Sequence, residues 1–291
     1  MKIYNLGSMN IDYVYRVPHF LQPGETLASG SLEIFPGGKG LNQSVALGRA
    51  GAQVIHGAFV GTGGEFLVRT LAGAAVDVSR IRPVEASPGH AIIQVDSTGQ
   101  NCILLYAGTN RMVDADYIES FLADAETGDI LLLQNECGCL REAMDRGREK
   151  GMQIAFNPSP FHPSILELLL EEVDWWFCNE IEGAALFGSG TPEAIADRFV
   201  RKYPGKHLIL TLGGEGSLYA RDAVRLRQDI YPAKAVDTTA AGDTFTGFFL
   251  ASVACGRSAA EALDTASRAA SVTVSRMGAA ASIPYMREIA G

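Results

Sequence analysis

Residues 235–249, reading AVDTTAAGDTFTGFF, join a turn of small residues to an apolar helix and set one carboxylate, Asp243, at the junction. Ala240, Ala241 and Gly242 carry little or no side chain, so their backbone N–H groups can approach an anion. The positive end of the helix faces the same point. The stretch therefore predicts an oxyanion or phosphate hole beside a general base, Asp243, that takes a proton from a hydroxyl. The simpler alternative is that Asp243 only caps the helix, since Asp is a favoured N-cap residue.

A second glycine-rich stretch lies near the start of the chain. Residues 36–52 read PGGKGLNQSVALGRAGA, a turn that exposes backbone followed by a helix with small residues over 41–47. The turn is not a Walker loop, because Lys39 is followed by glycine, and a GxGxxG dinucleotide fingerprint does not occur. The sequence therefore disfavours an NAD-dependent oxidoreductase, although that class shares the layered α/β pattern.

DTTAAGDTFTG and the glycine turn at 37–42 resemble the two signatures of the ribokinase-like, or pfkB, family of carbohydrate kinases. Both lie at the expected ends of a chain of the expected length, and together they cover residues 10–284. The resemblance implies an ATP-dependent kinase that transfers the γ-phosphoryl group to a sugar hydroxyl. D-Ribose is the expected sugar and ribose 5-phosphate the expected product. Asp243 would be the base, with the Ala240, Ala241 and Gly242 amides holding the transferring charge.

The fold expected is α/β, a doubly wound and mostly parallel sheet sandwiched by helices, with a small antiparallel β lid. With 291 residues and 47% hydrophobic composition, the chain suffices for one sizeable α/β domain, or for one domain with a small appendage. The resemblance implies a single ribokinase-like kinase domain over 1–291. Apolar runs predict strands at 2–6, 53–60, 76–78, 130–134, 153–156 and 208–212. Helices are expected at 65–74 and 140–150. Lid strands are expected to be inserted at about 12–17, 29–35 and 90–106, the last segment forming a hairpin that turns at 96–100.

Asn10 and Asp12 follow the first strand and alternate with apolar neighbours, which puts an amide and a carboxylate on one face of an extended segment. Such a pair can hold vicinal hydroxyls, or can simply be two polar residues on a solvated face. The family carries a sugar-binding Asn-x-Asp pair at this point. Cys137 and Asn135, beside the expected sugar ligand Glu136, depart from the family's usual surroundings and leave the sugar open. The resemblance assigns substrate binding to Asn10, Asp12, Gly38, Lys39, Asn42, Glu136 and Asp243.

Asn179 and Glu182 match the Asn-x-x-Glu pair with which the family organises Mg²⁺ and phosphates, largely through water. One carboxylate and an amide suffice, because Mg²⁺ keeps much of its hydration. The alternative is a capping Asn with an exposed Glu in the first helical turn. The resemblance assigns ATP binding to Asn179, Thr211, Gly213, Gly216 and Gly242. It assigns a monovalent-cation site, expected to take K⁺, to Asp237, Thr239, Thr273, Arg276, Gly278 and Ser282.

The composition gives no sign of a nucleic-acid or membrane partner. The formal net charge is -9, and Lys and Arg do not cluster. The opening residues lack the apolar core of a signal peptide, and no apolar run reaches the ~18 residues of a membrane span. The five cysteines form no disulfide framework, and Cys137 and Cys139 lack a second pair at zinc spacing. A cytoplasmic protein is expected.

Three questions stay open from the sequence alone. The acceptor can be ribose, or the fructose, ketodeoxygluconate or nucleoside that other members of this fold phosphorylate. A non-catalytic sugar- or nucleotide-binding regulator on the same scaffold is the alternative from another class, although base, anion hole and Asn-x-x-Glu pair are all intact. The exposed apolar face of a small lid needs cover, so we expect a homodimer formed through the lid.

Overall fold

Buried apolar runs form the central strands of a large, mostly parallel sheet in the computed structural model, which describes residues 1–289. The central strands pair in parallel, and the last two strands along one edge pair antiparallel. Within the described residues the sheet runs in the order β13 (Val224–Gln228), β12 (Ser217–Arg221), β11 (His207–Thr211), β10 (Val173–Asn179), β9 (Gln153–Asn157), β8 (Ile130–Gln134), β1 (Ile3–Leu6), β4 (Val54–Val60) and β5 (Ile81–Pro83).

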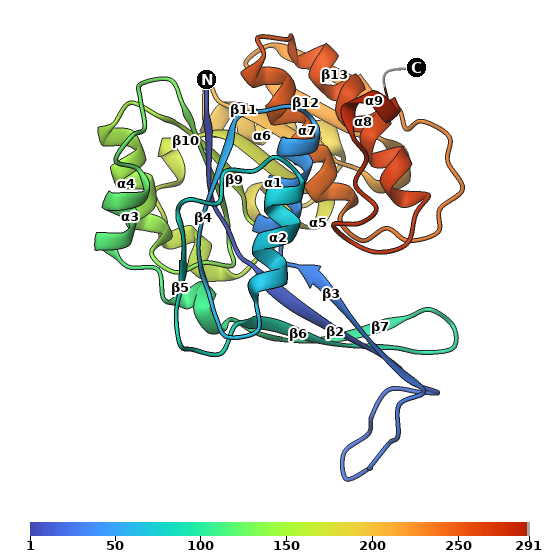
Figure 1. Cartoon of the computed structure of the whole chain (residues 1–291). Helices are drawn as coiled ribbons and strands as arrows, with labels where there is room; N and C mark the ends of the chain where they lie inside the picture. The colour runs from blue at the N-terminus through green and yellow to red at the C-terminus, as the bar shows by residue number, and fades with distance from the viewer. Residues whose placement is uncertain (290–291) are drawn as a thin grey trace.

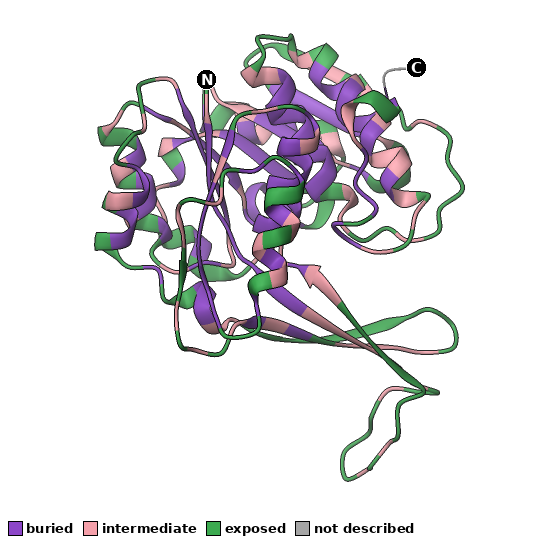
Figure 2. Ribbon diagram, in the orientation of Figure 1, coloured by how far each residue is buried: buried purple, intermediate pink, exposed green. Residues whose placement is uncertain are grey.

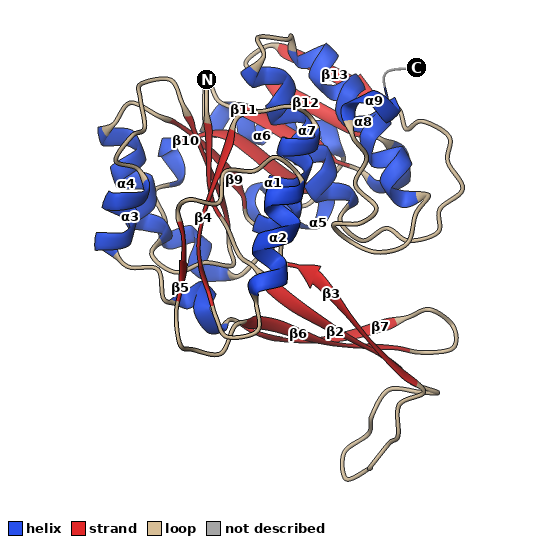
Figure 3. Cartoon of the chain, in the orientation of Figure 1, coloured by secondary structure: helices blue, strands red, loops and turns tan. Residues whose placement is uncertain are grey.

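Helices cover both faces of this sheet (Figures 1 and 3). They are α1 (Lys39–Arg49), α2 (Glu65–Gly73), α3 (Ala115–Phe121), α4 (Leu140–Glu149), α5 (Glu180–Phe187), α6 (Pro192–Lys202), α7 (Ala241–Ala254), α8 (Ala259–Val274) and α9 (Met286–Ile289). Short 3₁₀ turns are η1 (Gly108–Arg111), η2 (Pro163–Glu167), η3 (Leu170–Glu172) and η4 (Gly213–Glu215). Side chains alternate along β8, so that Leu132 packs with α1, α2, α7 and α8 while Leu131 and Leu133 pack with α3 to α6.

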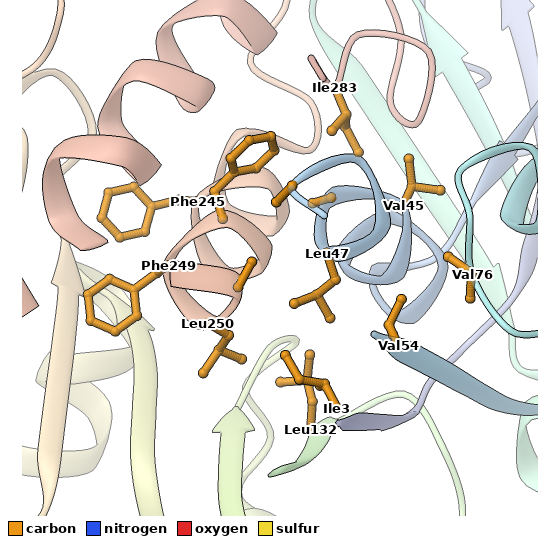
Figure 4. Packing of buried hydrophobic residues seen from close by; sticks show 14 of the residues in the cluster. Ile3, Val45, Leu47, Val54, Val76, Leu132, Phe245, Phe249, Leu250 and Ile283 are labelled. Carbon is orange, nitrogen blue, oxygen red and sulfur yellow. The ribbon is translucent and has the colours of Figure 1, made fainter. Parts of the chain in front are cut away.

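Helices α1 and α7 pack against each other over the middle of the sheet (Figure 4). Their closest approach is at Gly247, where an added Cβ would lie 2.4 Å from Cβ of Ala46. The start of α1 is pressed equally closely on the loop after β1, since a Cβ on Gly40 would lie 2.3 Å from Cα of Gly7. Small residues at these two contacts therefore let α1 pack closely against α7 and against the loop after β1.

A second, smaller sheet projects from the main body, and its far end is largely exposed (Figure 2). Its order is β3 (Ser31–Gly37), β2 (Asn10–Arg16), β6 (Gly89–Val95) and β7 (Asn101–Tyr106). The two outer pairs are antiparallel and the central β2–β6 pair is parallel. This sheet is the expected lid.

The fold class expected from the sequence is confirmed, down to strand 130–134, which coincides with β8. The strand expected at 76–78 is wrong. That segment makes one isolated bridge, between Ile55 and Asp77, and the edge strand β5 follows at Ile81–Pro83. Asp77 accepts a hydrogen bond from the Ser79 N–H at 2.8 Å, which bends the chain into a turn instead.

Candidate active site

Asp243 lies buried in the first turn of α7, where its carboxylate meets side chains of α1. The helix starts at Ala241, and its N-cap, Ala240, has a left-handed backbone with φ of 61°. Asp243 Oδ2 accepts a hydrogen bond from Asn42 Nδ2 at 3.0 Å, and Oδ1 accepts one from Gln43 Nε2 at 2.9 Å. The capping interpretation of Asp243 is therefore wrong, because its carboxylate bonds side chains of another helix.

The first turn of α7 offers backbone donors beside this carboxylate. Helix geometry leaves the N–H groups of Gly242 and Asp243 without a partner inside the helix. Ala241 is partly engaged, since its N–H donates to the Thr238 carbonyl at 3.3 Å. Ala240 precedes the helix, in a conformation that alanine adopts at a cost. Gly242 is thus the best placed of the three expected amides to meet an anion.

A cavity of about 750 Å³ opens from this turn. Most residues expected at the nucleotide lie on its wall, namely Asn179, Glu182, Thr211, Gly213, Gly216, Ala240, Ala241, Gly242 and Asp243. Ile230, Ala235, Ala270 and Val274 add an apolar wall that the sequence reading missed. These four come from a loop without periodicity and from a helix face, so no local pattern marks them.

Asn179 and Glu182 form a reciprocal capping box at the start of α5. The Glu182 N–H donates to Asn179 Oδ1 at 2.8 Å, and the Asn179 N–H donates to Glu182 Oε2 at 3.0 Å. The capping alternative therefore describes Asn179 correctly, but Glu182 is buried and lines the cavity rather than lying exposed. One carboxylate and one amide on the cavity wall fit Mg²⁺, which would keep water as its other ligands.

Lys39, the first residue of α1, lines this cavity, and its backbone N–H donates to Glu136. Burial alone would lower the pKa of Lys39, but the surrounding carboxylates of Asp243, Glu136 and Glu182 outweigh it and raise the pKa. The side chain therefore carries a positive charge at neutral pH. A cation at this place can offset the negative charge of a transferring phosphoryl group.

Glu136 follows β8 and is bound by the glycine turn. Its Oε2 accepts hydrogen bonds from the Lys39 N–H at 3.0 Å and from the Ser8 hydroxyl. Burial raises the pKa of Glu136, and Lys39 and these donors offset that only in part. Asp12 is half-buried in β2, where burial and then the charge of Glu136 raise its pKa to about 7.

Asn10, at the start of β2, is oriented by a residue that the sequence reading missed. Asn110 Nδ2 donates to Asn10 Oδ1 at 2.7 Å, and Asn110 Oδ1 accepts from the Met9 N–H at 3.0 Å. These bonds fix the amide of Asn10 so that its NH₂ group is turned away from Asn110. Gly38 is the N-cap of α1 and lies beside Asn10, with φ of 94°. Asn10, Asp12, Asn42 and Glu136 do not line the cavity, whereas Asp243 and Lys39 do, and these two bond Asn42 and Glu136.

The residues expected at a monovalent cation are brought together only in part. Asp237 accepts hydrogen bonds from the Thr239 N–H at 2.9 Å and from the Gly278 N–H at 2.9 Å. Burial alone would raise the pKa of Asp237, but these donors lower it overall. The remaining side chains bond other partners. Thr273 donates to the Thr244 hydroxyl, Ser282 donates to the Ala279 carbonyl, and Arg276 donates to Glu288. Backbone oxygens remain the donors that these residues can give a cation.

Across residues 1–289, no group of three or more His, Cys, Asp or Glu side chains is arranged to hold a metal ion. Cys137 is buried while Cys139 is exposed, and neither forms a disulfide. Over the same residues, no helix combines the length and apolar character needed to cross a bilayer.

Residues 2–286 match the pfkB family of carbohydrate kinases, and the chain belongs to this family. It is therefore a phosphotransferase that acts on carbohydrates. A ribokinase of Haemophilus influenzae is 32% identical over 97% of this chain and 95% of its own. The crystal structure of ribokinase from Thermotoga maritima superposes with a TM-score of 0.89 at 32% identity, covering 99% of this chain and 98% of that one. Arabidopsis thaliana ribokinase, solved with ribose and ATP, gives a TM-score of 0.88 at 28% identity, over 99% and 97% of the two chains.

Proposed function

We propose that this protein is an ATP-dependent ribokinase that converts D-ribose to ribose 5-phosphate. The observation that carries the proposal is the position of Asp243, held by Asn42 and Gln43 between the cavity and the cluster of Asn10, Asp12 and Glu136. A hydroxyl bound by that cluster lies next to a carboxylate that can take its proton. The ribokinase relatives and the Arabidopsis complex with ribose and ATP support the choice of substrates.

In the proposed reaction, the oxygen of the sugar's primary hydroxyl attacks the γ-phosphorus of ATP in line, and the bond from that phosphorus to the bridging oxygen breaks as ADP leaves. Asp243 takes the hydroxyl proton as attack begins, the Gly242 N–H and the positive end of α7 hold the transferring charge, and Lys39 balances it. Asn10, Asp12 and Glu136 hold the remaining hydroxyls in place.

Asn179 and Glu182 would hold Mg²⁺, largely through water, and the ion supplies charge neutralisation on the phosphates. Asp237 and Thr239, with backbone oxygens at Thr273, Arg276, Gly278 and Ser282, would hold K⁺. The Asp237 carboxylate accepts hydrogen bonds from the N–H groups of Thr239 and Gly278, which brings these two segments together and supports a cation site there.

The test of this function is ADP release from Mg-ATP with ribose, fructose, ketodeoxygluconate and nucleosides, each with and without K⁺. We expect ribose to give the highest kcat/KM and K⁺ to raise turnover. Another sugar preferred over ribose would overturn the specificity. Saturable binding of sugar or nucleotide without turnover on any acceptor would favour the regulator.

Asp243→Asn tests the base directly. The change keeps the size of the side chain but removes its basicity, and it gives up one of the two hydrogen bonds from Asn42 and Gln43 because an amide NH₂ group cannot accept, so we expect kcat to fall by roughly 10²–10⁴-fold. Equilibrium ATP binding, measured by calorimetry, should stay within about threefold, since the substitution is isosteric. A kcat close to that of the unmodified protein contradicts the assignment.

We further propose that two copies associate through the lid in a cytoplasmic homodimer. The lid exposes large apolar side chains, among them Ile34, Leu104 and Tyr106. The free thiols of all five cysteines fit a reducing compartment.

A further inference from the structure

A group of buried amide side chains connects the sheet to Asp243. Gln134 ends β8, Asn5 lies in β1 and Gln43 lies in α1, and all three are fully buried at 0% exposure. Gln134 Nε2 donates to Gln43 Oε1 at 2.8 Å and to Asn5 Oδ1 at 2.9 Å. Gln43 Nε2 in turn donates to Asp243 Oδ1 at 2.9 Å. Gln134 therefore reaches the carboxylate through a single intervening side chain.

Burial of these amides opposes stability. A buried polar group costs free energy unless it is fully hydrogen-bonded, and Gln134 Oε1 has no hydrogen-bond partner within residues 1–289. An apolar side chain of the same length would fill the space beneath α1 without that cost. The Gln134 amide thus calls for an explanation beyond packing.

The direction of the hydrogen bonds supplies the explanation. The Asp243 carboxylate can only accept, so Gln43 must present its NH₂ group and keep its oxygen away. Gln134 enforces this orientation by donating to Gln43 Oε1. Asn157 enforces it from the other side, because its Oδ1 accepts from Gln43 Nε2 at 3.1 Å while its own Nδ2 donates to the Phe177 carbonyl at 2.7 Å. A flipped Gln43 would set its oxygen against the carboxylate.

We propose that Gln43, oriented by Gln134, is the positioning residue that aims the Asp243 carboxylate at the acceptor hydroxyl. The proposal rests on the proposed role of Asp243 as base. Gln43 does not line the cavity, so it acts through Asp243. Asn42, the other donor to Asp243, is expected to contact the sugar itself and cannot be separated from binding in the same way.

Gln43→Met and Gln134→Met test the hydrogen-bonded path from Gln134 through Gln43 to Asp243, since methionine keeps the length of the side chain and removes the amide. Gln43→Met should lower kcat by about 10–100-fold, because small displacements of a reacting group are costly, while KM for ribose and for Mg-ATP changes less than about threefold. Gln134→Met should lower kcat by about 3–10-fold. The double variant should lose no more than Gln43→Met alone, because residues that act in series are not additive.

Ser44→Ala is the matched control. Ser44 is the next residue of α1 and equally buried, but its hydroxyl bonds Asn5 Nδ2 and His56 Nδ1 rather than Gln43, and it reaches Gln134 only through Asn5. Burial lowers the pKa of His56 to about 3, so the hydrogen-bonded group of Ser44, Asn5 and His56 carries no charge at neutral pH. Ser44→Ala should lower the unfolding temperature and leave kcat within about twofold, since it removes only a buried hydrogen bond remote from the carboxylate.

Three results would overturn the positioning role: full kcat in Gln43→Met, losses that multiply in the double variant, or an equal loss of kcat in Ser44→Ala. Each variant is assayed below its own unfolding temperature, and Gln134→Met carries the test alone if Gln43→Met does not fold. Asp243→Asn is assayed in the same series. Turnover kept by Asp243→Asn would overturn the base itself, whereas turnover lost there but kept in Gln43→Met would overturn the positioning role alone.

Discussion

Asp12 lies half-buried in β2 with Glu136 as its neighbour, and burial followed by that neighbouring charge raises its pKa to about 7. In the sugar site that we propose, an ionised Asp12 would accept hydrogen bonds from sugar hydroxyls, while the protonated form would lose part of that capacity. At pH 6 most free molecules carry the proton, so binding must release it. We therefore expect KM for ribose to rise as pH falls below about 7, approaching tenfold per pH unit, as proton linkage requires.

Steady-state kinetics between pH 5.5 and 8.5 measure this dependence. Asp12→Asn should raise KM by about 10–100-fold at pH 8, since a bond to a charged acceptor is lost, and should flatten the profile. Burial also raises the pKa of Glu136, so its titration could contribute to the same profile. The Glu136→Gln variant removes that carboxylate and leaves Asp12 as the titrating group of the pair. A ribose KM that stays constant from pH 6 to 8 in the unmodified protein would contradict the prediction.

At the scale of elements, the contact between α1 and α7 sets where Asn42 and Gln43 meet Asp243. Gly247 lies one turn after Asp243, and a Cβ there would lie 2.4 Å from Cβ of Ala46, closer than side chains pack. Gly247→Ala should push the helices apart, costing about 1–3 kcal/mol of unfolding free energy through overpacking. It should also lower kcat by about tenfold, because the donors to Asp243 are displaced.

Gly73→Ala, at the end of α2, is the control for a helical glycine without such a contact, since an added Cβ there meets nothing within 4 Å. It should leave kcat unchanged and raise stability by roughly 0.5 kcal/mol through helix propensity. Denaturant unfolding measures the stability of both variants, and initial rates measure their kcat. Equal effects of the two substitutions would mean that the contact at Gly247 does not set the site.

Elements with a strong local signal could be predicted from the sequence, while contacts between elements could not. The strand predicted at 130–134 has the same first and last residues as β8. The two glycine signatures mark where α1 and α7 begin. Strands β12 and β13 were missed: β13, at the edge of the sheet, is partly exposed and lacks an unbroken apolar run, and β12 is buried but carries only three apolar residues in a row, 218–220. The bond from Gln43 to Asp243 spans 200 residues, and only the topology brings its two ends together.

At the scale of the whole molecule, the lid presents an apolar face that the chain itself leaves uncovered. Cross-strand partners share a face, and the register pairs Asp12 with Ala91 and Ala91 with Leu105. The face turned away from Asp12 therefore carries the intervening residues. They are Leu32, Ile34, Ile92, Leu104 and Tyr106, with exposures of 48%, 53%, 36%, 68% and 53%. So large an apolar patch on a projecting sheet is typical of an interface.

Sedimentation velocity should find twice the chain mass of 31.0 kDa at micromolar concentration. Leu104→Lys places a charge on this apolar face of the lid, in its edge strand β7, and should shift the protein to monomer, since a buried unpaired charge is costly. Leu166→Lys replaces an equally apolar side chain, 56% exposed on η2 in the main body, and should leave the dimer intact. A monomeric unmodified protein would contradict the dimer, and a Leu104→Lys variant that remains dimeric would exclude this face of the lid. Because the lid strand β2 carries Asn10 and Asp12, which we propose bind the sugar, the monomeric variant should also bind ribose more weakly.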